Sequence, residues 1–298
     1  MKLSIIIVAY NSQKDFVRLL PSIFTQKKAK PEVIVVDNAS TDKTVSWLKK
    51  HYPKIKVIAN QQNRGFGTAN NQGIKAASND LLFLLNPDTR LQFGCLEQII
   101  SWFTVNPDKQ IAGCQLLNPD GSIQPSGGFN PTLFKLFCWA FFIDDLPIFR
   151  RLVKPYQARD LSFYQQERQF DWLMGAALIF RRPVFKQIGY FDEHIFLYGE
   201  EVELLFRAQK AKIPVWFLPQ AKVMHWGYDP KQSLKESAVL GEYQALDYFF
   251  RKHRPAWQCL VRRLILKSGA FLRAILFGKI THNKEKAKIY EKAWRLVK

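Results

Sequence analysis

The first third of the chain alternates short apolar runs with longer amphipathic segments. Uninterrupted apolar runs predict strands that are buried on both faces of a parallel sheet, at residues 3–10, 33–36, 55–59 and 80–85. Apolar residues at helical spacing lie between them, most clearly Phe16, Leu19, Leu20, Ile23 and Phe24. The alternation predicts an α/β fold with a right-handed, doubly wound, mostly parallel sheet flanked by helices.

Beyond residue 90 the alternation is less regular. We expect a helix near residues 96–105, whereas the aromatic stretch 133–149 fits no single element. The apolar segment 172–180 resumes the sheet, and residues 215–218 predict one more strand. A domain boundary is expected near Asp229-Pro230, after which the chain is helical and increasingly basic.

Polar residues follow each of the four strands predicted within residues 3–85. The strand ends read Tyr10-Asn11, Asp37-Asn38, residues 60–65 and Asn86-Pro87-Asp88. In doubly wound sheets, ligands bind beyond the carboxyl ends of the strands. The sequence therefore predicts a ligand site at this edge of the sheet.

Asp88 is the first candidate for metal binding. Pro87 restricts the backbone just before it, so a carboxylate is held at the end of an apolar strand. Mg²⁺ is bound by one or two carboxylates together with substrate phosphates, and Mn²⁺ accepts the same oxygens with an imidazole added. Asn-Pro-Asp is also good turn chemistry, so a plain turn is the alternative.

Asp37 and Arg64 are candidates for nucleotide binding. A carboxylate accepts the imide N–H of uracil or thymine, which adenine and cytosine lack, although Asp37 also suits a helix cap. Arg64, in the turn of residues 63–67, brings a guanidinium and nearby backbone amides to phosphate. The glycine-rich fingerprints of dehydrogenases and P-loop enzymes are missing from the sequence, which argues against those classes.

Two further positions suit catalysis or metal binding. Glu200 and Glu201 open a predicted helix, where a carboxylate either serves as a general base or simply stabilises the helix dipole. His225 lies between two apolar residues, so it is either a packed core histidine or a metal ligand.

The net charge of +19 is concentrated near the end of the chain. Residues 251–298 contain 14 basic residues and two acidic ones, a net charge of +12. This suits nucleic acid, an anionic lipid surface or a solvated helix face. A basic binding protein without catalysis is therefore the alternative function, but carboxylates at strand ends are a poor surface for phosphate-rich polymers.

The remaining composition bears on the cellular compartment. The chain is 47% hydrophobic, which excludes a disordered protein. Four cysteines form no CxxC pair, which favours a reducing cytosol. Residues 1–9 imitate a short signal peptide without a cleavage site, and no uncharged run reaches the ~20 residues that span a bilayer.

The motifs at the strand ends resemble those of family 2 glycosyltransferases of GT-A fold, in particular the rhamnosyltransferase-like branch of bacterial cell-surface polysaccharide synthesis. The resemblance extends over residues 3–233, and its motifs are residues 4–11, 35–42, 63–67, 84–88 and 191–203. No single motif is specific, but their order and spacing together are. A sugar nucleotidyltransferase is a weaker alternative, because no glycine-rich basic loop follows the first strand.

The resemblance implies a nucleotide-sugar site formed by Tyr10, Asp37, Arg64 and Asn86. Asn86 stands where many relatives carry Asp, so it offers a neutral carbonyl to the site. Asp88 and His225 are implied to hold Mg²⁺ or Mn²⁺.

The resemblance also implies the acceptor side and the base. Glu201 matches the family's base, with Glu200 as its rival on the acceptor side. Trp172 and Gly175 match acceptor-binding positions, where an aromatic face stacks on a sugar and glycine admits it closely, although core packing is an equal alternative for Trp172.

The implied reaction inverts configuration at the sugar. A hexose, which the branch implies to be L-rhamnose, moves from a dTDP- or UDP-sugar to a hydroxyl of a polyprenyl-diphosphate-linked saccharide. Residues 1–230 are then the catalytic domain, with the nucleotide-sugar half at about 1–115 and the acceptor half at about 116–230, and 231–298 form a basic helical extension. We expect no nucleic-acid partner.

The C-terminal extension contains an amphipathic helix. Its apolar residues between Trp257 and Leu276 keep helical spacing, while Arg262, Arg263, Lys267 and Arg273 lie on other faces. This pattern predicts a protein on the inner face of the cell membrane, held there by the helix. The alternative is a helix that docks on the catalytic domain.

Overall fold

The structure is a computed structural model that describes residues 1–26, 28–146, 154–227 and 236–297. The chain forms two compact units. Unit 1 comprises Met1–Gly127, Leu161–Phe196 and Glu201–Asp229, and unit 2 comprises Gly128–Asp160, Leu197–Glu200 and Pro230–Lys298. Unit 2 thus consists of three segments that are separate in the sequence. The predicted boundary at Asp229-Pro230 lies outside the described residues.

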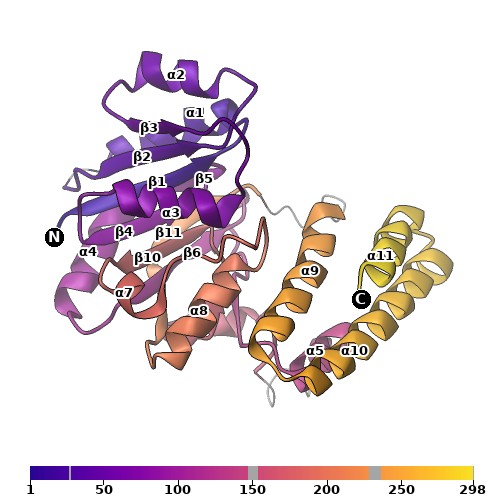
Figure 1. The fold of residues 1–298 in the computed structure, drawn as a ribbon. Helices are drawn as coiled ribbons and strands as arrows, with labels where there is room; N and C mark the ends of the chain where they lie inside the picture. Colours follow the sequence, from indigo (N-terminus) through magenta and orange to yellow (C-terminus); the bar gives the residue numbers. More distant parts are fainter. Residues whose placement is uncertain (27, 147–153, 228–235, 298) are drawn as a thin grey trace. The chain divides into compact units, whose positions relative to one another are not determined.

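Unit 1 is built on a large mixed sheet (Figure 1). Its strands are β1 (Leu3–Ala9), β2 (Glu32–Asp37), β3 (Lys56–Ala59), β4 (Leu81–Leu85), β5 (Thr89–Leu91), β6 (Ile111–Leu117), β8 (Arg168–Phe170), β10 (Ala177–Arg181) and β11 (Val215–His225). They lie in the order β3-β2-β1-β4-β10-β6-β11-β5, and β8 pairs with β11. The four predicted N-terminal strands are present and mutually parallel. β10 enters antiparallel between β4 and β6, and β11 runs parallel to β6.

Helices cover both faces of this sheet. They are α1 (Gln13–Phe24), α2 (Thr44–His51), α3 (Phe66–Ala76), α4 (Cys95–Val105), α7 (Val184–Ile188) and α8 (Glu200–Lys210). Ile5 and Ile7 of β1 share one hydrophobic core with α1, α2 and α4. Ile6 points to the other face, where a Cβ on Gly73 of α3 would lie 2.3 Å from its side chain. The predicted doubly wound α/β fold is therefore confirmed.

The connections place the carboxyl ends of β1, β2 and β4 side by side. The chain passes outward from β1 to β2 and β3, and then returns on the other side of β1 as β4. Such a reversal leaves an opening beyond the carboxyl ends of the strands, where ligands bind. Asp37 ends β2, and Asn86 directly follows β4.

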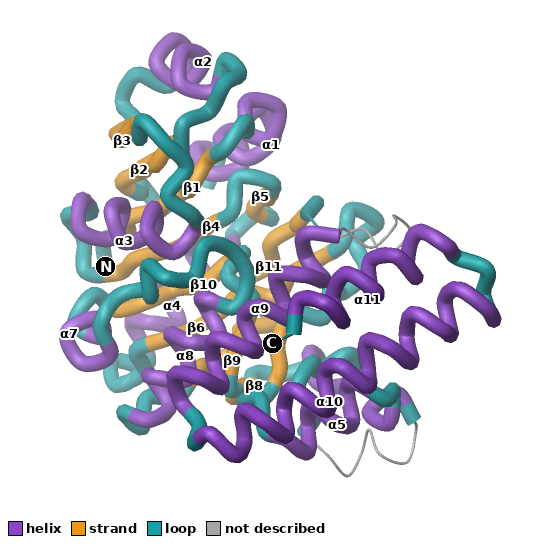
Figure 2. The backbone as a smooth tube through the Cα atoms, turned by 45° about the vertical axis from the view of Figure 1, so that its right-hand side comes forward, coloured by secondary structure: helices purple, strands orange, loops and turns teal. Residues whose placement is uncertain are grey.

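Unit 2 is mainly helical, as predicted for the C-terminal region. Its helices are α5 (Leu133–Ala140), the 3₁₀ helix η1 (Ile143–Asp145), α9 (Glu236–His253), α10 (Ala256–Ile275), the π-helix η3 (Leu276–Ile280) and α11 (Lys284–Leu296). The remaining short elements of the chain are β7 (Gly127–Gly128), the 3₁₀ helix η2 (Leu161–Tyr164) and β9 (Trp172–Leu173). α10 packs against α5, α9 and α11 (Figure 2).

Two arginines of α10 are buried and hold unit 2 together. Arg273 donates hydrogen bonds to the carbonyls of Trp139 and Ala140 in α5, and its guanidinium lies 4.6 Å from the Trp139 ring centroid. Arg262 donates to Asp247 of α9. Although the sequence pattern treats these residues as part of a basic face, their charges serve contacts between helices.

The segment of residues 197–200 packs against α9 within unit 2. Tyr198 and Gly199 both have left-handed backbone angles, with φ of 69° and 80°. A Cβ on Gly241 of α9 would lie 2.2 Å from the Tyr198 ring, and a Cβ on Gly199 would lie 2.4 Å from Ala245. The turn that leads into α8 therefore fits α9 only because both contacts are made by glycine.

Candidate active site

The turn after β1 is locked to the turn after β2. Asn11, at φ 53°, accepts hydrogen bonds through Oδ1 from the backbone N–H groups of Thr41 at 2.8 Å and Asp42 at 3.2 Å. Burial acts to raise the pKa of Asp42, but hydrogen bonds from Thr44 outweigh it and hold that pKa below its ordinary value. Tyr10 is 53% exposed, so its ring lies at the rim of this edge.

Asp37 is buried at the end of β2. Its carboxylate accepts hydrogen bonds from both the backbone N–H and the hydroxyl of Ser40, whereas the helix that follows, α2, has Lys43 at its N-cap, so Asp37 is not that helix's cap. The neighbouring Asn38 donates to the carbonyl of Gly65 at 3.1 Å, which ties the β2 end to the loop that carries the exposed Arg64. The structure brings Asp37 and this loop together, and their roles in nucleotide binding stay predictions.

Strand pairing places His225 beside Asp88. β11 and β5 are antiparallel, with His225 opposite Thr89, and the N–H of Trp226 donates to the carbonyl of Asp88 at 2.9 Å. As a result, Nε2 of His225 lies 3.5 Å from Oδ1 of Asp88. His225 is 5% exposed, whereas the Asp88 side chain is 29% exposed and opens the pair to one side.

Several features around this pair fit a divalent cation. The described residues contain no cluster of three or more His, Cys, Asp or Glu side chains at metal spacing. Asn86, however, adds an oxygen, because its Oδ1 is buried and has no hydrogen-bond partner among the described residues. Gly227 leaves space beside the pair, since a Cβ there would lie 2.5 Å from Oδ2 of Asp88 and 2.9 Å from Nε2 of His225. Oxygens and one imidazole are the donor set that Mn²⁺ and Mg²⁺ use.

Gln124 is a further candidate site residue, which the sequence does not reveal. It is fully buried, and its Oε1 lies 2.8 Å from Nδ1 of His225. The sequence offers only a weak signal for it, the turn at Asn118-Pro119-Asp120-Gly121, because a buried glutamine has no recognisable spacing to a histidine a hundred residues away.

Glu201 lies next to Gly175. A Cβ on Gly175 would be 3.9 Å from the carboxyl carbon of Glu201 and 3.5 Å from the ring of Phe66. The next residue, Ala176, accepts a hydrogen bond from the N–H of Asn86 at 3.0 Å. The structure therefore joins Glu201, Gly175 and the end of β4 through direct contacts.

The other acidic and aromatic candidates are more buried. Glu200 is 4% exposed, whereas Glu201 is partly exposed, which favours Glu201 for contact with a substrate. Glu203 is fully buried and accepts hydrogen bonds from Arg207, so it is structural. Trp172 is 8% exposed, as the packing alternative expects, and its acceptor role stays a prediction.

Comparison with known proteins identifies the family. Residues 4–147 match Glycosyl transferase family 2. A Bacillus subtilis protein named uncharacterized glycosyltransferase YwdF is 30% identical over 261 residues, which cover 85% of this chain and 84% of that protein. The chain belongs to glycosyltransferase family 2.

Two further similarities concern the branch and the fold of this family 2 glycosyltransferase. The N-acetylglucosaminyl-diphospho-decaprenol L-rhamnosyltransferase of Mycobacterium tuberculosis is 27% identical over 290 residues, with 92% of each chain covered. The solved mannosyltransferase PcManGT from Pyrobaculum calidifontis, in complex with GDP-Man and Mn²⁺, has a TM-score of 0.59 at 15% identity and covers 98% of this chain and 85% of its own. The predicted GT-A type fold is confirmed.

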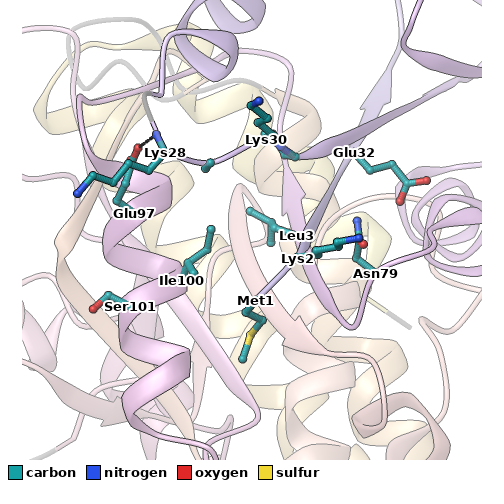
Figure 3. A pocket seen from close by; sticks show the side chains of 12 residues that line it. Met1, Lys2, Leu3, Lys28, Lys30, Glu32, Asn79, Glu97, Ile100 and Ser101 are labelled. Carbon is teal, nitrogen blue, oxygen red and sulfur yellow. Dashed lines mark hydrogen bonds between the residues drawn. The ribbon is translucent and has the colours of Figure 1, made fainter.

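A pocket of about 870 Å³ lies at the opposite edge of the glycosyltransferase sheet (Figure 3). It is lined by the amino ends of β1 and β2 and by α4. Figure 3 shows Glu97 beside Lys28, and the Glu97 carboxylate accepts a hydrogen bond from the backbone N–H of Lys28 at 2.9 Å. None of the site residues predicted from the sequence lines it. This pocket is therefore separate from the polar carboxyl ends.

Proposed function

We propose that this glycosyltransferase is a divalent-metal-dependent, inverting enzyme that transfers a hexose, with L-rhamnose as the first choice, from a dTDP- or UDP-sugar. The proposed acceptor is a hydroxyl of a lipid-linked saccharide in cell-envelope polysaccharide synthesis. The similarity to the mycobacterial L-rhamnosyltransferase supports the donor sugar and the acceptor class. The Asp88–His225 pair, with the buried oxygen of Asn86 and the space beside Gly227, is the observation that carries the metal-dependent reaction.

The proposed mechanism uses residues on both sides of the β4 end. Tyr10, Asp37 and Arg64 bind the nucleotide, and Asp88 and His225 hold Mg²⁺ or Mn²⁺. A metal held there would supply Lewis-acid stabilisation of the nucleoside diphosphate that leaves. Glu201 accepts the proton of the acceptor hydroxyl while the hydroxyl oxygen attacks the anomeric carbon.

A single displacement by the acceptor hydroxyl accounts for inversion. The new bond forms on the face of the sugar opposite the departing diphosphate, so a single displacement inverts the anomeric configuration. The side chain of Glu201 is partly exposed beside Gly175, where the missing Cβ leaves room for an acceptor to approach. No covalent intermediate is required, because the acceptor oxygen bonds to the anomeric carbon as the bond to the diphosphate breaks, and Glu201 takes the hydroxyl proton.

Removal of the metal is expected to abolish turnover. Purified protein incubated with a panel of UDP- and dTDP-sugars should release nucleoside diphosphate with Mg²⁺ or Mn²⁺ and lose at least ~100-fold in rate with excess EDTA, since the metal supplies several kcal/mol. Coupled detection of UDP or dTDP measures the rate, and added Mn²⁺ should restore it. Equal turnover with and without EDTA would contradict the proposed metal dependence. If dTDP-rhamnose were turned over more slowly than every other donor, the assignment of L-rhamnose as the transferred sugar would be wrong.

We further propose that unit 2 binds an anionic membrane surface through α10. Trp257, Leu260, Leu264 and Phe271, here called the α10 stripe, are each more than half exposed at helical spacing. Apart from the buried Arg262 and Arg273, residues 251–298 contain 12 basic residues and two acidic ones, which suits anionic lipid. None of the described helices is long and apolar enough to cross a bilayer.

Leu264→Glu is expected to weaken binding to anionic vesicles by about tenfold, because burying one leucine side chain contributes roughly 1.5 to 3 kcal/mol. Flotation with vesicles of anionic lipid, and with neutral vesicles for comparison, measures the bound fraction. Val105→Glu replaces an apolar side chain of unit 1 that is 73% exposed and should leave binding unchanged. Equal binding by the wild type and Leu264→Glu would refute the role of the stripe.

A further inference from the structure

A chain of hydrogen bonds runs behind His225, on the side away from Asp88. Nδ1 of His225 lies 2.8 Å from Oε1 of Gln124, and Nε2 of Gln124 donates to Oδ1 of Asn118 at 3.0 Å. Nδ2 of Asn118 donates to Oγ of Ser122 at 2.9 Å, and that hydroxyl donates to Asp120 at 2.6 Å. His225, Gln124 and Asn118 are all buried.

Asp120 sets the direction of the whole chain. An ionised carboxylate only accepts hydrogen bonds, so the Ser122 hydroxyl must donate to it and accept from Asn118. The Asn118 side chain then faces Gln124 with its oxygen, which accepts a hydrogen bond from Nε2 of Gln124. Oε1 of Gln124 therefore points toward His225. Oε1 of Gln124 can only accept, and so Nδ1 of His225 carries the proton.

In the neutral ring, the other nitrogen then offers its lone pair toward Asp88. With the proton on Nδ1, neutral His225 presents an unprotonated Nε2, which lies 3.5 Å from Oδ1 of Asp88. Two electron-rich atoms that face each other favour a cation between them, beside the space that Gly227 leaves. A histidine with the opposite tautomer would turn an N–H toward that space and repel the cation.

We propose that Gln124 is a positioning residue that fixes the tautomer and ring orientation of His225, with its own orientation determined by Asn118, Ser122 and Asp120. The inference rests on the proposed metal-dependent function, and it deepens that function by assigning the group behind the metal ligand. Such outer hydrogen bonds typically contribute 10- to 100-fold to metal affinity.

Gln124→Met tests the proposal directly, because methionine has a similar size and offers no comparable acceptor. Mn²⁺ alone is titrated into each protein, and free Mn²⁺ is measured by electron paramagnetic resonance. Gln124→Met should bind Mn²⁺ about 10- to 100-fold more weakly than the wild type. Gln124→Glu retains an oxygen acceptor for Nδ1 of His225, so its affinity for Mn²⁺ should be closer to that of the wild type than to that of Gln124→Met.

Gln26→Met is the matched control. Gln26 is also a buried glutamine of unit 1, but its amide donates to the carbonyls of Ser22 and Gln92. This variant loses the same polar group and should keep the wild-type affinity for Mn²⁺. Thermal unfolding of all variants separates a loss of stability from a loss of metal binding.

A second readout does not depend on the metal. The chain contains five histidines, so ¹⁵N-histidine labelling gives a simple spectrum, with the His225 signals identified by their loss in His225→Asn. Wild-type His225 should show a protonated Nδ1 and an unprotonated Nε2, whereas Gln124→Met should show a mixture of tautomers. Wild-type Mn²⁺ affinity together with an unchanged tautomer in Gln124→Met would overturn this inference alone. No Mn²⁺ binding by the wild type would instead overturn the proposed metal-dependent function.

Discussion

Asp88→Asn is expected to lower kcat/KM for sugar transfer by about a thousandfold, which corresponds to about 4 kcal/mol of transition-state stabilisation. The amide has the shape of the carboxylate, so the fold around β4 and β5 should be preserved. Its charge is lost, and the neighbouring Asn86 contributes none in its place. Steady-state rates measured across a Mn²⁺ titration check the prediction, and the concentration of Mn²⁺ needed for half-maximal rate should rise.

Asp80→Asn provides the comparison on the same strand. Asp80 immediately precedes β4 at the edge of the sheet opposite Asp88, and its side chain is exposed. The substitution changes the net charge equally and should alter kcat/KM by less than twofold. If the two variants lost activity to the same extent, a general effect of charge would replace the proposed local role of Asp88.

Glu201→Gln is expected to reduce kcat by about a thousandfold, within the range of roughly 10² to 10⁴ that a general base contributes. The glutamine keeps the contact with Gly175 but cannot accept the proton of the acceptor hydroxyl. The KM for the donor should change little, because the proposed donor-binding residues lie at the ends of other elements, β1, β2 and β4 among them. Initial rates at saturating donor, together with a direct donor-binding measurement, separate the two effects.

Glu200→Gln distinguishes the two neighbouring carboxylates. Glu200 is 4% exposed, and we expect this variant to retain at least a tenth of the wild-type kcat. The opposite ranking, with Glu200→Gln the more damaged variant, would assign the base to Glu200.

The strands at the centre of the site were predictable because of how they are buried. β1, β2 and β4 are covered by helices on both faces, so nearly every residue in them is apolar and the runs are unmistakable. The polar residues at their ends are equally visible in the sequence. Parallel pairing then places those ends at one edge, which is why Asp37 and Asp88 were recognised as candidates.

The partner of Asp88 could not be derived from the pattern alone. His225 reaches Asp88 through the antiparallel pairing of β11 with β5, two strands that are remote in the sequence and unequal in length. Nothing local in either strand specifies that register. His225 was suggested by resemblance to the family, and its place beside Asp88 is a property of the tertiary structure.

Gln124 and Arg273 illustrate a second limit of the sequence. Both are polar residues in segments where solvent exposure is the ordinary expectation, and both are buried because particular partners satisfy their hydrogen bonds. Those partners are contributed by distant segments. Hydrophobic periodicity predicts which face of an element is buried. It does not predict which polar side chains are buried and hydrogen-bonded to distant segments.

Because Tyr198 and Gly199 contact α9, truncation cannot separate the proposed membrane binding from catalysis. α9 belongs to the region that carries the α10 stripe, yet Gly241 and Ala245 also form the wall against which the turn before Glu200 and Glu201 is folded. A shortened chain that ends before α9 loses that wall, so two consecutive left-handed residues lose the packing that holds them. The helical region is therefore not a detachable module, and the proposed membrane binding must be tested by changing surface residues, with the backbone of α9 left in place.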